Sequence, residues 1–249
     1  MHWFREIEMK IAVVCCLHGT EPYGLEVFLQ LPVFISGFIG NERALKENKR
    51  FIETDLNRCF PGDKFGKNEE RLAYDLYNKL KEFDYVIDLH SSSNDCPLFG
   101  IITNPTMKKI YLARRLGLKK LVIMEKSIAG GKALIDFVRC GISLEVGPHN
   151  REENTQEALD SINNLIENKS YSNDLEIYEV FKIIKKEREI VLINNFEKIK
   201  CGQIISADSK GKQQAEEDFT AVLVNEEAYE NILCLAAKRL DKNSSLLKT

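Results

Sequence analysis

The stretch IAVVCCLHGTE, residues 11–21, decides the interpretation of the fold. Its apolar first half is typical of a buried strand, and the polar residues His18 and Glu21 follow at once. These two side chains lie three positions apart on the connection that leaves the strand, so they can converge on one point. Such spacing is typical of metal ligands, although an isolated pair of this kind also occurs by accident on protein surfaces.

Further short apolar runs predict a series of buried strands along the first two thirds of the chain, at residues 33–39, 85–89, 98–103, 120–124 and 142–146. Apolar residues at helical spacing lie between these runs, within residues 68–80, 110–117 and 158–166. Strands that alternate with helices predict an α/β fold, with a mixed or largely parallel sheet covered by helices on both faces.

The polar stretch ENKSYSND, residues 167–174, breaks this alternation and predicts a domain boundary. We therefore expect a first domain over residues 1–174 and a small β-rich domain over 175–249. The runs IYEVFKII, EIVLI and FTAVLV predict strands in the second domain. A helix is expected from the cap Asn225 through Tyr229 to Ala236.

The composition limits the classes of function. A net charge of -3 gives no general attraction to nucleic acid or to an anionic membrane, but allows a local basic pocket for a small anionic ligand. The longest apolar stretch, residues 27–39, is too short to span a bilayer. Seven cysteines without a CxxC pair, and an N-terminus without a secretory signal, predict a cytoplasmic protein.

Two more ionisable residues end predicted strands. His90 ends DYVIDLH and Glu145 ends ISLEV, so both are expected beside His18 and Glu21 if the strands are parallel neighbours. Two imidazole nitrogens and one carboxylate suit zinc and leave a fourth position for water, although a satisfied core histidine is the alternative for His90. Asp88 shares a strand face with His90 and either orients its imidazole or is a solvated strand-end carboxylate.

Basic and amide side chains gather in the segment of residues 50–62, where Arg50, Asn57 and Arg58 occur close together. A guanidinium group offers a planar fork of donors, which can clamp a carboxylate or polarise a carbonyl. An exposed loop with solvated charges is the alternative interpretation of the same segment.

Together these motifs resemble the aspartoacylase and succinylglutamate desuccinylase family, which are zinc amidohydrolases related in fold to zinc carboxypeptidases. The resemblance rests on four motifs in the family's order: His18-Gly-x-Glu21, Arg50 with Asp55-Leu-Asn57-Arg58, Asp88-Leu-His90 and Glu145-Val-Gly-Pro. In addition, VNEEAY at residues 224–229 is similar to the family's C-terminal segment. It implies a carboxypeptidase-like catalytic domain and a β-rich C-terminal domain that caps the cleft.

The resemblance also implies the roles at the reacting bond. His18, Glu21 and His90 would hold one zinc ion per chain, and Glu145 would be the general base for the attacking water. Arg50 would polarise the carbonyl of the amide that is hydrolysed. The implied activity is zinc-dependent hydrolysis of an N-acyl amino acid.

For the substrate, the resemblance implies that Asn57, Arg58 and Tyr229 bind the carboxylate of a small anionic N-acyl amino acid. The chain departs from aspartoacylases at two basic positions, which are Ile135 and Ile232 here. The acyl group, the amino acid and any homo-oligomer are therefore left open. The alternatives are a zinc carboxypeptidase that acts on short peptides, and a catalytically silent binding protein of the same fold.

Overall fold

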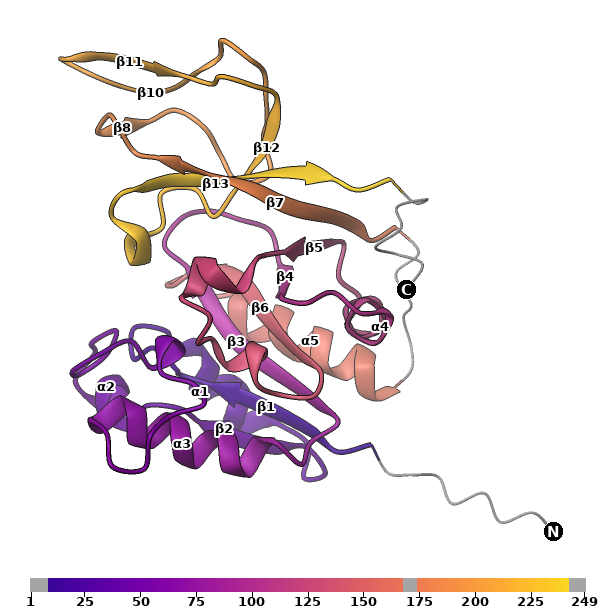
Figure 1. The fold of residues 1–249 in the computed structure, drawn as a ribbon. Helices are drawn as coiled ribbons and strands as arrows, with labels where there is room; N and C mark the ends of the chain where they lie inside the picture. Colours follow the sequence, from indigo (N-terminus) through magenta and orange to yellow (C-terminus); the bar gives the residue numbers. More distant parts are fainter. Residues whose placement is uncertain (1–8, 168–173, 242–249) are drawn as a thin grey trace.

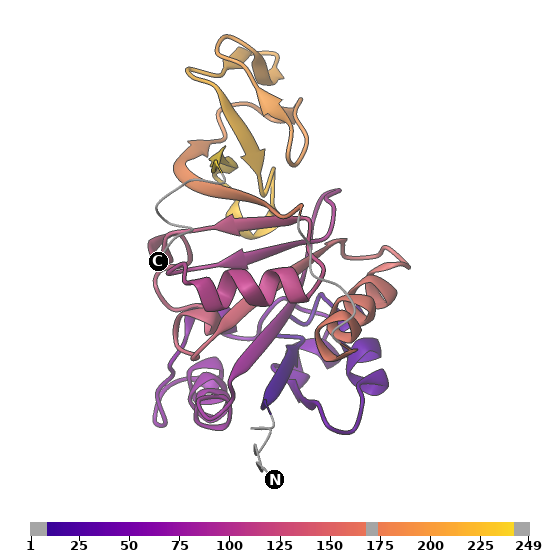
Figure 2. The same ribbon diagram turned by 90° about the vertical axis from the view of Figure 1, so that its right-hand side faces the viewer.

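The computed structural model describes residues 9–167 and 174–241. Its main feature is one ten-stranded mixed sheet in the order β2-β1-β3-β6-β4-β5-β7-β13-β12-β9, shown in Figures 1 and 2. Its first six strands in chain order are β1 (Ile11–Cys15), β2 (Ser36–Ile39), β3 (Tyr85–Ser92), β4 (Phe99–Ile102), β5 (Lys120–Ile123) and β6 (Gly141–Pro148). The expected α/β class with a mixed sheet is confirmed.

Helices cover both faces of the first part of the sheet, because alternate residues of each strand are apolar. Ile11, Val13 and Cys15 of β1 pack in the core with α1 and α5, whereas Ala12 and Val14 pack with α3 on the other face. The helices are α1 (Tyr23–Gln30), α2 (Glu42–Lys46), α3 (Asn68–Leu80), α4 (Met107–Arg115) and α5 (Asn154–Glu167). None of those in the described ranges is both long and apolar enough to cross a membrane.

The four strands β2, β1, β3 and β6 run parallel as neighbours, and this order positions the site. The next strand, β4, is antiparallel to β6, and β5 and β7 then run parallel to β4. The carboxyl ends of β1, β3 and β6 therefore meet at one edge of the sheet.

The C-terminal part is β-rich, as expected, and it extends the same sheet (Figure 1). Its strands in the sheet are β7 (Glu176–Lys185), β9 (Lys198–Ile199), β12 (Phe219–Val222) and β13 (Ile232–Arg239). A separate three-stranded sheet contains β8 (Ile190–Val191), β10 (Ile204–Asp208) and β11 (Gly211–Gln214). The domain division between residues 174 and 175 stays a prediction, and most of the polar stretch that suggested it lies outside the described residues.

Two local predictions were wrong. The helix expected from Asn225 to Ala236 is a short 3-10 turn, η4 (Glu227–Tyr229), followed by β13, which pairs with both β7 and β12. An apolar run such as residues 232–237 fits a buried strand or a buried helix, and only the strand partners on both sides decide between them. The strand expected from residue 33 begins at Ser36, because the chain first makes a turn in which the backbone N–H of Ile35 donates to the oxygen of Pro32 at 2.9 Å.

Candidate active site

The ionisable side chains expected at the strand ends lie together. His18 and Glu21 follow β1, His90 is near the end of β3, and Glu145 is its register partner on β6. Apolar residues alternate with them on the strands, so Ile142, Leu144 and Val146 face the core while Glu145 faces the opposite side. The chain makes a tight turn between His18 and Glu21, where a Cβ on Gly19 would lie 2.1 Å from the backbone of Ala44.

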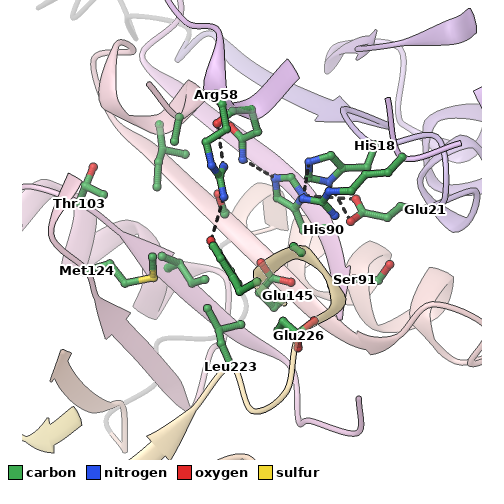
Figure 3. A pocket seen from close by; sticks show the side chains of 18 residues that line it. His18, Glu21, Arg58, His90, Ser91, Thr103, Met124, Glu145, Leu223 and Glu226 are labelled. Atoms are coloured by element: carbon green, nitrogen blue, oxygen red, sulfur yellow. Dashed lines mark hydrogen bonds and ion pairs between the residues drawn. The ribbon is translucent and has the colours of Figure 1, made fainter. Parts of the chain in front are cut away.

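His18, Glu21 and His90 form a buried cluster with the geometry of a cation site. Their potential ligand atoms all lie within 4.8 Å of one another. Glu21 lies between the two rings, with Oε1 3.0 Å from His18 Nδ1 and Oε2 3.3 Å from His90 Nδ1. Figure 3 shows the three side chains pointing toward one another.

An outer carboxylate contacts the far side of each imidazole. Asp88 Oδ2 lies 2.7 Å from Nε2 of His90, and Asp55 Oδ1 lies 3.0 Å from Nε2 of His18. Because a carboxylate only accepts hydrogen bonds, the Asp88 contact requires a proton on Nε2 of His90. In a neutral imidazole this leaves the Nδ1 lone pair of His90 directed at the centre of the cluster, as a metal ligand needs. Nε2 of His18 lies between Asp55, which only accepts, and Nη2 of Arg50, which only donates, at 2.9 Å, so these contacts do not fix the tautomer of His18.

The electrostatics of the cluster call for a positive charge. Burial opposes ionisation of Glu21, but His18 and His90 outweigh it and hold the pKa of Glu21 far below its usual range. Burial likewise lowers the pKa of His90, and Asp88 with Glu21 reverses this and raises the pKa well above its ordinary value. Glu21 Oε2 is buried and accepts no hydrogen bond from the described residues. Either protons on the imidazoles or a divalent cation would neutralise this group, so the residues fit a metal ion.

Glu145 differs from Glu21 in its surroundings. Burial raises the pKa of Glu145 to about 7, and nearby His90 only partly offsets this while Glu21 and Glu226 add to it. A carboxyl group with a pKa near neutrality can both take and return a proton during a reaction. Glu145 lines the pocket beside the cluster without belonging to the His18, Glu21 and His90 triplet.

The predicted substrate residues line the same pocket. Arg50 donates to Asp55 Oδ2 at 3.0 Å. Arg58, which is labelled in Figure 3, donates to the hydroxyl of Tyr229 at 2.9 Å. The Asn57 side chain accepts from the backbone N–H of Leu134 at 2.9 Å. The pocket has about 680 Å³ of empty space, including the part open to solvent. All eight predicted site residues line it: His18, Glu21, Arg50, Asn57, Arg58, His90, Glu145 and Tyr229.

Two buried carboxylates hold the loops that deliver these residues. Glu69 is fully buried and accepts from the backbone N–H groups of residues 52–54, which fixes the segment between Arg50 and Asp55. Glu226 accepts from the backbone N–H of Ser93 at 2.8 Å, just after β3. This contact ties the segment that carries Tyr229 to the sheet edge, although residues 93 and 226 are far apart in sequence.

Some residues of the site were missed by the sequence interpretation. Asp55 was noted only as part of a motif, and nothing local indicates that it contacts His18. Glu226 lines the pocket and is buried, with Oε1 lacking a hydrogen-bond partner in the described chain. Ser91 also lines the pocket and lies 2.7 Å from Nδ1 of His149, across two strand ends. Position directly after a strand-end residue is the only sequence signal for Ser91.

Comparisons with known proteins identify relatives of this chain. The family model described as "Succinylglutamate desuccinylase/Aspartoacylase catalytic domain" matches residues 8–170. A probable aspartoacylase of Acaryochloris marina is 31% identical over 43% of this chain and 43% of that protein. An N-acyl-aromatic-L-amino acid amidohydrolase (carboxylate-forming) B of Danio rerio is 26% identical over 55% of this chain and 54% of that protein. The chain thus aligns with about half the length of these two relatives.

The fold is also that of a solved enzyme structure. Murine aminoacylase 3 superimposes with a TM-score of 0.77 over 93% of this chain and 95% of that one, at 19% sequence identity. At this level of identity the likeness shows the fold alone. It extends over the N-terminal part and the β-rich C-terminal part together.

Proposed function

Since the chain belongs to the succinylglutamate desuccinylase/aspartoacylase family, we propose that it is a zinc-dependent amidohydrolase that removes the acyl group from an N-acyl amino acid. The observation that carries the proposal is the buried cluster of His18, Glu21 and His90 with Glu145 beside it in one pocket. Two nitrogens and one carboxylate are a ligand set of catalytic zinc sites, which keep a position for water. The cluster would hold one zinc ion per chain.

Each residue of the pocket then has a role in the reaction. A bound zinc ion would supply Lewis acidity, which activates water near neutral pH and polarises a carbonyl group. Glu145 takes a proton from the water as its oxygen attacks the amide carbonyl carbon. Arg50 stabilises the negative charge that develops on the carbonyl oxygen. Glu145 then returns the proton to the amide nitrogen as the C–N bond breaks, so the products are a carboxylic acid and a free amino acid.

The carboxylate of the amino acid is assigned to Arg58, with Asn57 and Tyr229 beside it. Arg58 donates to the backbone oxygen of Asn57 and to the Tyr229 hydroxyl, so its guanidinium group is held in place before substrate arrives. A fixed guanidinium binds a carboxylate with little loss of conformational freedom. This favours a small anionic substrate over a neutral amide.

A zinc carboxypeptidase acting on short peptides would use the same cluster and the same glutamate. The contact between Arg58 and Tyr229 joins the N-terminal part of the pocket to the β-rich C-terminal part, and it leaves less room for a peptide. The names of the two relatives differ in the amino acid, which is acidic for an aspartoacylase and aromatic for the other enzyme. They leave open which side chain the present pocket accepts.

The test is an assay of amine release from a panel of N-acyl amino acids by the zinc-loaded protein, with zinc content measured on the same preparation. We expect about one zinc per chain and amine release that stops when a chelator removes the metal. Short peptides with a free carboxyl end serve as the competing substrates. A preparation with full zinc that releases amine from no N-acyl amino acid would refute the proposed activity.

A further inference from the structure

We propose that the pocket binds the amino acid side chain of the substrate on an apolar surface, so that the substrates are N-acyl derivatives of aliphatic or aromatic amino acids and not of acidic ones. The inference rests on the proposed function and specifies its substrate class. It is drawn from the side of the pocket that faces away from His18, Glu21 and His90, which we call the cation cluster.

That side of the pocket is built from apolar residues, which we call the apolar wall. The wall combines segments from β4, the end of β5, the turn at η3 (Leu134–Asp136) and the residue after β12: Ile101, Met124, Ala133, Ile135 and Leu223. Figure 3 shows Met124 and Leu223 on the opposite side of the pocket from His18 and Glu21. A surface of this kind gains free energy when a substrate's apolar group displaces water from it.

The apolar wall belongs to the core of the protein and is therefore preformed. Its five residues are members of one buried cluster, together with Phe99, Val122 and Tyr178. Ile135 is 3% exposed and Ile101 is 6% exposed, so neighbouring side chains restrict their movement. All five wall side chains are apolar, and their packing in this core keeps them facing the pocket.

Among the described residues that line the pocket, no cation is available for a second substrate carboxylate. In the described part of the chain, two arginines line the pocket: Arg50, which pairs with Asp55, and Arg58, which is assigned to the α-carboxylate. No lysine is among the described residues that line it. Two lysines that are not among the lining residues contact the neighbouring backbone, where Lys109 donates to the oxygen of Thr103 at 2.6 Å and Lys126 to that of Asp136 at 3.4 Å.

Thr103 is a polar residue that lines the same pocket, and its side chain is already hydrogen-bonded. The hydroxyl of Thr103 donates to Oδ1 of Asp136 at 2.6 Å, so its proton is not free for a substrate carboxylate. A carboxylate placed against the apolar wall would lose its water without gaining a partner. An apolar side chain in the same position would lose nothing, and this difference selects the substrate.

The position of Arg58 identifies which part of the substrate meets the wall. The side chain of an amino acid leaves the same carbon as its α-carboxylate, so it lies next to the group that binds the carboxylate. Figure 3 shows Arg58 between His90 on one side and Met124 on the other. Arg58 also donates to the hydroxyl of Tyr229. With the α-carboxylate on Arg58 and the amide at the cluster, the side chain extends onto the wall.

The experiment compares kcat/KM of the zinc-loaded protein for substrates that share an acetyl group and differ only in the side chain. We expect N-acetyl-L-leucine or N-acetyl-L-phenylalanine to exceed N-acetyl-L-aspartate by at least about 100-fold. A second series keeps leucine and lengthens the acyl chain, and it is expected to change kcat/KM less than the side chain does.

Substitutions at one wall position sharpen the comparison. Ile135→Arg brings a cation to the wall and should reduce the leucine-to-aspartate ratio by at least about 10-fold, mainly through KM. Ile135→Leu keeps the volume and should leave the ratio nearly unchanged. Ile190→Arg, at an exposed position of β8, controls for the added charge. If Ile135→Arg does not fold, Met124→Lys places a cation on the same wall from another element.

The outcomes separate the two proposals. Equal or better hydrolysis of N-acetyl-L-aspartate would overturn the apolar subsite and leave the proposed amidohydrolase standing. A preference that follows the acyl chain instead of the side chain would overturn the placement of the side chain on the wall. Failure to release amine from any of these substrates at full zinc content would refute the proposed function itself.

Discussion

The two sides of the pocket are buried to the same extent and are opposite in chemistry. The polar side, which we call the polar wall, is formed by His18, Glu21, His90, Glu145 and Glu226. His18, Glu21 and His90 are 3%, 2% and 4% exposed. On the apolar wall, Ile101 and Ile135 are 6% and 3% exposed. Equal burial therefore has opposite consequences, because burying apolar groups stabilises a fold whereas burying ionisable groups costs free energy unless they are paired.

The polar wall shows where this cost remains. Of the six buried side-chain atoms without a hydrogen-bond partner in the described ranges, two lie on this wall and one lies directly behind it: Glu21 Oε2 and Glu226 Oε1 on the wall, and Asp88 Oδ1 behind His90. Groups left in this way are unusual in folded proteins and gather where function requires them. We therefore expect substitutions on the polar wall to reduce activity, and substitutions on the apolar wall to reduce stability or alter specificity.

The largest effect is expected at the centre of the polar wall. His90→Ala removes one of two imidazole ligands, so the protein should lose most of its zinc and its activity should fall by roughly 10⁴-fold or more. Elemental analysis and the amine-release assay measure the two quantities. His149→Ala removes a histidine that contacts Ser91 near the pocket but is not in the ligand triplet, so it should leave the zinc content unchanged. Retention of a full zinc ion by His90→Ala would remove His90 from the ligand set.

Glu145→Gln should separate chemistry from metal binding on the same wall. The amide keeps the size of the side chain but cannot carry the proton, so turnover should fall by roughly 10²- to 10⁴-fold while zinc content stays at one per chain. Both are measured on one folded preparation. Full zinc with near-normal turnover would leave Glu145 with a structural role only.

On the apolar wall, Ile101→Ala should have its main effect on stability. The substitution leaves a cavity in a buried cluster and should lower the free energy of unfolding by about 2–5 kcal/mol. Urea denaturation measures this change, and zinc content should remain that of the parent protein. A loss of zinc without a loss of stability would contradict the division between the two walls.

The polar wall should also destabilise the metal-free protein in a pH-dependent way. Burial raises the pKa of Glu145 from 4.5 to about 7. Between these values the folded state keeps a proton that the unfolded state has lost, so the free energy of unfolding falls as pH rises, by roughly 3 kcal/mol in total. Metal-free Glu145→Gln should therefore be more stable than the parent at pH 8 and similar at pH 4, as thermal melting can measure. Equal stability at both pH values would show that Glu145 is not desolvated.

The smallest effect is expected behind the ligands. Asp88→Asn weakens the hydrogen bond that orients His90 and should reduce zinc affinity by about 10- to 100-fold. Competition with a chelating dye measures the affinity. Asp75→Asn, at an exposed position of α3, is the control for loss of a carboxylate. An unchanged affinity in Asp88→Asn would make Asp88 a partner of Ser143 alone, whose hydroxyl donates to it at 3.2 Å.

The sequence by itself determined the polar wall to a large extent. Apolar runs that end in His18, His90 and Glu145 predicted strands whose carboxyl ends meet, and the structure places those strands side by side as β1, β3 and β6. This prediction succeeded because both signals are local in the sequence. A short apolar run indicates a buried strand, and the ionisable residue at the end of the run marks the carboxyl end of that strand.

Only the tertiary structure decided the rest. The contact of Asp55 with His18 joins residues 37 positions apart, and the apolar wall combines residues from 101 to 223. The run at residues 232–237 is a strand because β7 and β12 pair with its two edges, not because of its own periodicity. Local patterns report which faces of an element are apolar, but the partner that meets each face is set by packing and pairing across the whole chain.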